Sequence, residues 1–484
     1  MRNLNSLNRL DLKVALSKVK HDRGWGLRIE TFVVDPYEFE LIIGDDQECF
    51  KSIGNRLNVG YVPCEAVEVP VPKGDGQMRR VNLLSLEDHL VYSALVLECV
   101  PKIREVLQWS AGSVRFSNIL LEDQSGGNWV EFPMNSWKSF RSQSEEFAKE
   151  SKSVVFADIE GFYDNIDTEQ LICELEIMGV KGDILDLLKR CLYKWNNGSG
   201  KGIPQGYSAS NILTEFYLDS IDYALKCKGF NHVRFVDDFR IFCDSEAEAM
   251  DACCTLSELC MDKGLKLKDS KTRIVPGNKA LKEIQGIDPI IKVSNGPIQD
   301  QKYLIRLFKN FILNNKGFDK SLLHYLLNRI FEPLFVKKCQ SIIFERPEET
   351  KQVLIYFNNL LRKGHDLMGV VEDLAVKLLA GVGVYEYQKY LFLKWIFENK
   401  IVSPSLLKIV GDVSGQEFEI ESIRNFCVAY MGDNGGLPEI PRLRLILKQT
   451  NDNFTMKLTY KAIEDILERY LGSACEPISV SVNS

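Results

Sequence analysis

Two adjacent aspartates, Asp237 and Asp238, stand between two apolar runs in RFVDDFRIFC (234–243). The runs are rich in β-branched and aromatic residues, so the pattern predicts a strand, a two-residue turn made by the aspartates and a second strand. Asp-Asp suits such a turn poorly, because tight hairpins favour glycine in the second turn position and adjacent carboxylates repel each other without a cation between them. Taken alone, the pair fits a solvated turn better than a functional site.

A third carboxylate favours a metal site over a solvated turn. SVVFADIEGFYDNID (153–167) is an apolar run ending on Asp158, so it predicts a strand that projects this carboxylate from its end. If Asp158 lies beside the Asp237-Asp238 hairpin in one sheet, three carboxylates can hold two magnesium ions about 3.5–4 Å apart. Such a pair of ions activates a 3′-hydroxyl and stabilises a leaving pyrophosphate. The repulsion between the aspartates would then serve metal binding.

Two further segments carry residues suited to a nucleotide. In GKGIPQGYSASN (200–211), glycines flank Pro204-Gln205, so backbone can approach a ligand closely and Gln205 offers a donor and an acceptor. In VPVPKGDGQMRRVNLLSLEDHLVYSAL (69–95), basic residues surround a glycine-containing turn, forming a hairpin that could clamp a triphosphate. Read separately, the first segment is a loop and the second is equally well a solvated turn.

Length and composition describe a globular chain of more than one domain. The 484 residues are 45% hydrophobic and 26% charged, and no apolar stretch of about 18 residues could span a bilayer. The N-terminal segment lacks the apolar block of a signal peptide, so we expect a cytoplasmic protein outside the membrane. Thirteen cysteines without a C-x-x-C pair argue against a zinc module and a disulfide framework.

The net charge of −7 provides no general attraction to nucleic acid, so any such site must come from a local cluster. MDKGLKLKDSKTRI contains one candidate, a run of cations that outnumber the acids: Lys263, Lys266, Lys268, Lys271 and Arg273. Runs of this kind are usually solvated faces. Its place beside the expected carboxylate site favours a basic patch that contacts nucleic acid.

The pattern of apolar residues changes along the chain. From about 151 to 290, strand patterns alternate with helical ones such as DTEQLICELEIMG, which begins with Asp167 and Gln170 at capping spacing and ends on Gly179. From about 300 onward the pattern is almost purely helical with brief breaks, which predicts stacked helical hairpins. No fixed period marks these helices as a repeat solenoid. The fold class is therefore α+β.

In chain order, these motifs resemble those of a reverse transcriptase over roughly residues 50–290. The matching stretches are Asp158 in FADIEGFYDNI, GIPQG at 202–206, FVDD at 235–238, GLKLKDSKTRI at 264–274, and IQG at 284–286, which resembles the short hairpin supporting the primer end. Two departures stand out. Phe235 replaces the usual tyrosine, and Arg80 replaces a proline, which leaves open whether Arg79 or Arg80 contacts phosphate.

The resemblance implies roles for the acidic residues and their neighbours. Asp158, Asp237 and Asp238 would be the catalytic metal ligands for two Mg²⁺ ions, with Mn²⁺ as a substitute and the carbonyl of Ile159 as an additional ligand. Tyr163 would pack beneath the sugar and exclude a 2′-hydroxyl, which implies deoxynucleoside triphosphates as substrates.

The resemblance also implies contacts to the nucleotide and the primer. Nucleotide-binding residues would be Lys73, Arg79, Arg80, Tyr163, Gln205 and Lys271, the last near the leaving pyrophosphate. Primer support would come from Ile284, Gln285 and Gly286. Arg115 in WSAGSVRFSN (109–118) is either a template contact or part of a structural ion pair.

The implied architecture is a right-hand polymerase, with fingers and palm of reverse-transcriptase type, followed by an all-α domain. Residues 1–150 would form the N-terminal region and fingers, and 151–295 the palm with the catalytic motifs. Residues 296–484 would form an α-helical domain that is thumb-like and helical-repeat-like. No C-x-x-C nuclease module or acidic RNase H cluster follows the polymerase motifs.

A long helical C-terminal part resembles the defence-associated, abortive-infection (Abi-type) reverse transcriptases of bacteria. That resemblance implies an RNA-directed DNA polymerase in antiphage defence, templated by a noncoding RNA or template-independent, with protein priming as one option and a homo-oligomer as the assembly. A retroelement or retron-type enzyme that copies a dedicated RNA is the alternative. A helical scaffold with a vestigial polymerase fold is an alternative of another class.

Overall fold

The computed structural model describes residues 6–22, 46–74, 76–286, 300–313, 319–418 and 420–474. By their internal contacts, these residues form two compact units. The first unit comprises the described residues within 1–31, 42–68 and 81–291, and the second those within 69–80 and 292–484.

A four-stranded antiparallel sheet lies at the centre of the first unit, in the order β4-β5-β3-β6. Its strands are β3 (Ser153–Asp158), β4 (Asn231–Phe235), β5 (Asp238–Cys243) and β6 (Arg273–Pro276). Strand β3 is central, and its residues are buried until Asp158. Because both faces of the sheet are covered, β3 is continuously apolar and does not alternate with polar residues.

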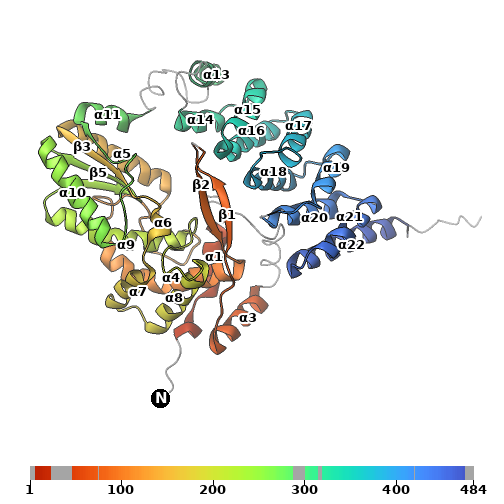
Figure 1. Ribbon diagram of the computed structural model, residues 1–484, viewed down its shortest axis with the longest axis horizontal. Helices are drawn as coiled ribbons and strands as arrows, with labels where there is room; N and C mark the ends of the chain where they lie inside the picture. Colours follow the sequence, from red (N-terminus) through yellow and green to blue (C-terminus); the bar gives the residue numbers. More distant parts are fainter. Residues whose placement is uncertain are drawn as a thin grey trace, which may run out of the picture. The chain divides into compact units, whose positions relative to one another are not determined.

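Helices cover both faces of this sheet. On one face, α5 (Pro133–Glu150) and α11 (Gly277–Gln285) pack against side chains that include Val154 and Phe156. On the other, α10 (Glu246–Asp262) covers Val155 and Ala157, as Figure 1 shows for the sheet and its helices. Successive β3 side chains point to opposite faces, so one strand stabilises both layers.

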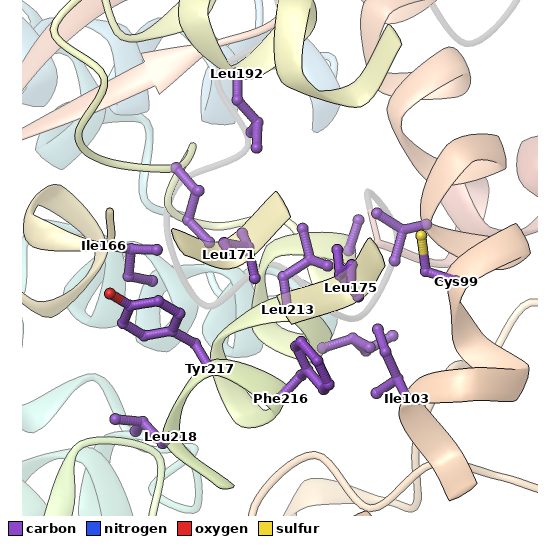
Figure 2. Packing of buried hydrophobic residues seen from close by; sticks show 14 of the residues in the cluster. Cys99, Ile103, Ile166, Leu171, Leu175, Leu192, Leu213, Phe216, Tyr217 and Leu218 are labelled. Atoms are coloured by element: carbon purple, nitrogen blue, oxygen red, sulfur yellow. The ribbon is translucent and has the colours of Figure 1, made fainter. Parts of the chain in front are cut away.

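The main core of the first unit lies between helices. Its centre is α4 (Leu86–Leu107), packed against α7 (Thr168–Ile177), α8 (Gly182–Trp195) and α9 (Ser208–Cys227). Figure 2 shows Cys99 and Ile103 of α4 near Leu175 of α7 and Phe216 of α9. The remaining helices of this unit are η1 (Ser6–Arg9), α1 (Leu12–His21), α3 (Asp46–Val59) and α6 (Phe162–Asn165).

The described part of the second unit is helical except for one hairpin. Strands β1 (Val67–Pro72) and β2 (Met78–Leu83) form this hairpin, which extends across the boundary of the units. The helices are α13 (Gln301–Leu307), η3 (Phe308–Leu313), α14 (Lys320–Leu327), η4 (Pro333–Phe335), α15 (Val336–Glu345), η5 (Pro347–Glu349), α16 (Thr350–Arg362), α17 (Met368–Leu379), α18 (Glu386–Glu398), α19 (Pro404–Val413), α20 (Ser422–Asn434), η6 (Leu437–Glu439), α21 (Ile440–Gln449) and α22 (Asn453–Ala474).

These helices stack in a regular order. Helix α16 packs against α14 and α18, α18 packs against α20, and α20 packs against α22. Helices α15, α17, α19 and α21 each pack against the helix that follows, and α17 also packs against α19. Figure 1 shows the succession from α14 to α22. The α+β fold with a helical C-terminal region is confirmed. No helix in the described ranges combines the length and apolarity needed to cross a bilayer.

Helix α9 buries three acidic side chains on one face, Glu215, Asp219 and Asp222. Glu215 and Asp222 both pair with Arg234 of β4. Asp219 instead accepts a hydrogen bond from Nε1 of Trp109 at 3.0 Å. Burial, followed by the charge of Asp222, raises the pKa of Asp219 to about 6. The ionised form of Asp219 is therefore unfavourable in the folded protein.

We predict that Asp219→Asn stabilises the fold in a pH-dependent way. A raised folded-state pKa means that the protonated acid stabilises the fold at low pH, and that this contribution is lost as pH rises through about 6. The neutral amide should raise the melting temperature by about 3 °C at about pH 8 and leave it unchanged at about pH 4. Scanning calorimetry measures the change in melting temperature at each pH, with the exposed Asp251→Asn as control. Equal effects at the two pH values would contradict this assignment.

Candidate active site

The sheet brings the three predicted aspartates together. In the antiparallel pairing of β3 with β5, Asp158 lies directly opposite Asp238. In the pairing of β4 with β5, Phe235 lies opposite Asp238, so Val236 and Asp237 form a two-residue connection. Side chains directly opposite in an antiparallel pair have Cβ atoms about 4.5–5.5 Å apart. Hydrogen-bonded backbone therefore fixes Asp158 beside the hairpin.

The turn differs from the predicted one by a single residue. Asp238 is the first residue of β5, and Val236 takes the turn position that the sequence pattern assigned to Asp238. Val236 has φ +57°, a left-handed conformation that β-branched residues rarely adopt. The prediction was wrong here because strand propensity placed Val236 in the strand. Strand propensity is a local property and does not include the side chains, distant in sequence, that hold Val236 in the turn.

The site concentrates negative charge that burial makes unfavourable. Burial, followed by the charge of Asp158, raises the pKa of Asp237 to about 6. Burial also raises the pKa of Asp238, against the guanidinium of Arg240 at 3.5 Å. Nζ of Lys271 lies 2.5 Å from Oδ2 of Asp158. Two cationic side chains thus offset part of the charge of three carboxylates.

The donor set has the chemistry of a divalent-cation site. Carboxylate and carbonyl oxygens are the ligands that Mg²⁺ and Mn²⁺ prefer, and a cation would offset the mutual repulsion of the aspartates. As the side chains stand, no three His, Cys, Asp or Glu residues of the described ranges are grouped to hold a metal, since Asp158 and Asp238 face Lys271 and Arg240. Metal binding therefore requires these two ion pairs to loosen.

Two backbone hydrogen bonds join the segment after Asp158 to residues 266–268, and neither involves the carbonyl of Ile159. The N–H of Lys268 donates to the carbonyl of Asp158, and that of Glu160 donates to the carbonyl of Lys266. The side chain of Ile159 is buried in the core. Its role as an additional metal ligand remains a prediction.

Tyr163 and Gln205 line one cavity of about 760 Å³ beside the turn. Loop 202–206 is tied to the segment after β3, because the N–H of Gly202 donates to the carbonyl of Ile166 and that of Ile203 to the carbonyl of Tyr163. Gly202 has φ +92°, and a Cβ there would lie 3.2 Å from the carbonyl oxygen of Asp164, so the loop requires glycine. This close approach brings the two predicted nucleotide-binding residues to one space.

Two side chains of the candidate site were not among the residues predicted from the sequence. Asn211 lines the same cavity and accepts a hydrogen bond from Oη of Tyr163 at 2.6 Å, which fixes the tyrosine ring. Arg240, with its guanidinium 4.2 Å from the centre of the Phe140 ring, faces Asp238. The strand period of two could have revealed Arg240, since residues 238 and 240 share a face. No local signal marks Asn211.

The predicted basic hairpin exists, and residues 69–80 of it belong to the second unit. Lys73 follows β1, and its N–H donates to the carbonyl of Gln77 at 2.8 Å. Arg79 and Arg80 lie in β2, the first half-buried and the second exposed. Their contacts to a triphosphate remain predictions.

The IQG segment has a different form from the expected hairpin. Ile284 and Gln285 are the last residues of α11, and Ile284 is buried against the sheet. The carbonyl of Gln285 accepts from Arg141 at 2.9 Å, and Gly286 follows with φ +51°. Helical periodicity in KALKEIQ explains the difference, because it buries Ile284 on the same face as Ala280. The role of this segment in primer support remains a prediction.

The basic run at 263–273 is largely neutralised. Lys263 is buried and donates to Glu174 at 2.7 Å, so it is a core ion pair. Three of the other four cations also form ion pairs, Lys266 with Glu160 and Asp269, Lys271 with Asp158, and Arg273 with Glu283. These pairs reduce the net positive charge of the run, and the sequence did not reveal them because most of the acids are distant in the chain. Contact of the run with nucleic acid remains a prediction.

Arg115 is structural. Its guanidinium is buried and donates to the carbonyls of Leu107, Ser117 and Asn118. These contacts hold the segment beside β4, where the N–H of Phe116 donates to the carbonyl of Arg234. The alternative of a template contact does not fit a side chain that is 2% exposed.

The sequence profile described as "Reverse transcriptase (RNA-dependent DNA polymerase)" matches residues 71–296, which include the sheet, the three aspartates and the Gln205 loop. The chain contains a reverse transcriptase domain. The domain is that of an RNA-directed DNA polymerase, an enzyme class that uses divalent metal ions.

Solved structures of low similarity include three structures of two telomerases. The chain is 14% identical to telomerase from Candida albicans in complex with a TWJ fragment of telomeric RNA, covering 76% of this chain and 66% of that one, with a TM-score of 0.33. Apo telomerase from Candida tropicalis is 11% identical over 86% and 74% of the chains, with a TM-score of 0.31. The complex of that telomerase with a TWJ fragment is 11% identical over 85% and 68%, with a TM-score of 0.33. No curated protein matches the chain.

We predict that Lys271→Gln tightens metal binding. The ammonium group of Lys271 competes with a cation for Asp158, so its removal should increase Mn²⁺ affinity about threefold, a modest factor because the lysine is 53% exposed. Electron paramagnetic resonance of free Mn²⁺ measures this without nucleotide. Lys266→Gln, which removes a cation paired with Glu160, is the matched control. Unchanged or weaker binding in Lys271→Gln would contradict the competition.

Proposed function

We propose that the reverse transcriptase domain adds deoxynucleotides by two-metal nucleotidyl transfer. The observation that carries this proposal is the register of β3 with β5, which sets Asp158 opposite Asp238 with Asp237 in the adjoining turn. Three carboxylates at one end of a sheet, beside a cavity large enough for a nucleotide, match the needs of that chemistry.

Asp158, Asp237 and Asp238 would hold two Mg²⁺ ions, or Mn²⁺ in their place, with the Ile159 carbonyl as a further ligand. When bound, the ions supply activation of the primer 3′-hydroxyl and stabilisation of the leaving pyrophosphate. Lys271, already 2.5 Å from Asp158, is placed to offset negative charge or donate a proton at the pyrophosphate.

The residues around the cavity would select and orient the nucleotide. Tyr163, held by Asn211, would lie under the sugar and exclude a 2′-hydroxyl, and Gln205 would contact the nucleotide from the opposite loop. Lys73, with Arg79 or Arg80, would bind the triphosphate, and the 284–286 segment would support the primer.

We propose that the enzyme acts in antiphage defence of the abortive-infection type as a cytoplasmic homo-oligomer. The support is architectural: the described part of residues 300–474 is a stack of helices, with no nuclease-like sheet in these ranges. A noncoding RNA would serve as the template, or synthesis would proceed without one.

We also propose that a tyrosine hydroxyl of the protein could prime synthesis. Burial limits which tyrosines of residues 356–470 could supply it. Tyr356, Tyr387, Tyr390 and Tyr430 are buried, and the hydroxyl groups of Tyr356 and Tyr430 already donate to carbonyls. The exposed ones are Tyr385, Tyr460 and Tyr470. A primer hydroxyl from this part of the chain would come from one of these three.

Removing the carboxylates of the hairpin tests the polymerase. Asp237→Ala with Asp238→Ala should reduce magnesium-dependent deoxynucleotide incorporation to background, because two of the three ligands are lost. The melting temperature should not fall, since both acids have pKa values raised mainly by burial. Asp251→Ala with Asp262→Ala, two exposed acids of α10, is the matched control. Incorporation at the level of this control would refute the metal site.

The same double variant separates the defence hypothesis from the scaffold hypothesis. In a phage plaque assay, a polymerase-dependent defence loses protection in the double variant and keeps it in the α10 control. A scaffold with a vestigial polymerase would protect equally with either variant. A retron-type enzyme would be indicated by copurification of one dedicated RNA with its DNA copy.

Tyr163→Ala should admit ribonucleotides. Removal of the ring opens the space that a 2′-hydroxyl needs, so the preference for deoxynucleotides should fall at least about tenfold. Competition between a deoxynucleotide and the matching ribonucleotide measures the ratio, with Tyr223→Ala, an exposed tyrosine, as control. An unchanged ratio would remove Tyr163 from sugar selection.

A further inference from the structure

Val236 is the strained point of the catalytic hairpin. It has φ +57°, although it is β-branched and precedes Asp237 directly. The other non-glycine residues with positive φ in the described ranges are Asn118, Asn197 and Lys400. Asparagine tolerates this conformation, whereas valine holds it only where its surroundings enforce it. The neighbours of Val236 therefore determine the direction of the turn.

Two buried side chains hold the two sides of Val236. Its N–H donates to Oγ of Ser117 at 2.7 Å, and its carbonyl accepts from Nη1 of Arg234 at 2.8 Å. Ser117 reaches this position because its segment lies beside β4, with Arg234 N donating to the carbonyl of Val114. Ser117 is 1% exposed and Arg234 is fully buried, so water does not compete for these bonds.

One carboxylate orients both of these side chains. Oγ of Ser117 donates to Oε1 of Glu215 at 2.5 Å, and Nη1 of Arg234 donates to Oε2 of the same residue at 2.7 Å. Because the serine proton is committed to Glu215, its oxygen is left to accept from Val236. Asp222 takes the remaining face of the guanidinium, at 2.9 Å from Nε and 2.6 Å from Nη2.

We propose that Glu215, acting through Ser117 and Arg234, is a positioning residue that keeps Val236 in the left-handed conformation and thereby aims Asp237 at the metal site. If Val236 relaxed to an ordinary backbone conformation, the peptide joining it to Asp237 would rotate and turn the carboxylate away. The proposal rests on the proposed function, since it concerns the same metal site.

The arrangement contains more than a structural ion pair requires. A buried Arg–Asp pair is satisfied by the contacts of Arg234 with Asp222 alone, and burial of such pairs is weak support for stability. Glu215 accepts from three groups, which are Oγ of Ser117, Nδ2 of Asn118 and Nη1 of Arg234. Ser117 and Arg234 continue to the backbone of Val236. The buried network therefore ends on the strained residue.

Rescue by glycine tests the proposal. Ser117→Ala removes the hydrogen bond to the N–H of Val236 and leaves both carboxylates that pair with Arg234 in place. It should lower kcat for incorporation about tenfold, leave KM for the nucleotide unchanged, and weaken Mn²⁺ binding without nucleotide by a similar factor. Glycine adopts positive φ at no steric cost. Val236→Gly added to Ser117→Ala should therefore restore both kcat and Mn²⁺ affinity to within about threefold of the wild type.

Two controls separate positioning from stability. Val236→Gly alone is the reference for the double variant, because it measures separately any effect that loss of the valine side chain has on kcat and Mn²⁺ affinity. Ser144→Ala removes a fully buried serine that donates to the carbonyl of Phe140, and should lower the melting temperature with no effect that glycine at 236 rescues. If Ser117→Ala does not fold, Ser117→Cys takes its place, since a thiol accepts weakly.

The outcomes distinguish this proposal from the proposed function. A double variant as impaired in Mn²⁺ binding as Ser117→Ala would overturn positioning, as would unchanged Mn²⁺ binding in Ser117→Ala. If the wild type binds Mn²⁺ and incorporates no nucleotide, the polymerase proposal fails, and recovery of Mn²⁺ affinity by glycine still supports positioning of Asp237.

Discussion

The pairing of β3 with β5 is the constraint on which the site depends. It fixes Asp158 opposite Asp238 by backbone hydrogen bonds, so the carboxylates remain together although their charges repel. Burial and the charge of Asp158 raise the pKa of Asp237 as a consequence. The stable core on both faces of β3 holds the pairing, and the end of the strand leaves the site accessible.

Cationic side chains and the strained turn complete the design of the site. Lys271 and Arg240 partly neutralise the aspartates, and Lys271, which is 53% exposed, can give way to a divalent cation more easily than a buried network can. Behind the turn, Glu215, Ser117 and Arg234 form such a network, which fixes the backbone. The charge beside the aspartates can therefore change when a metal binds, whereas the backbone that positions Asp237 is rigid.

The sequence predicted features that depend on local pattern. The continuous apolar run before Asp158 gave a central strand, and the cap predicted at Asp167 is present, since its carboxylate accepts from the N–H of Gln170. Helical periodicity predicted the stacked helices of the second unit. The ordered motifs identified the reverse transcriptase domain.

The features that the sequence did not predict depend on partners distant in the chain. Val236 leaves the strand because Ser117, more than a hundred residues earlier, holds its N–H. Lys263 is a core residue because Glu174 lies on a helix packed nearby. The short IQG motif has the form of a helix end in this chain, where packing of Ile284 against the sheet determines the backbone.

Anomalous diffraction from crystals soaked in Mn²⁺ tests the central claim most directly. The account predicts an anomalous peak in contact with carboxylate oxygens of Asp158 and Asp237, with Lys271 displaced from Asp158 and Val236 still at positive φ. A structure with saturating Mn²⁺ in which these carboxylates bind no ion, or in which Asp158 keeps its contact with Lys271, would contradict it.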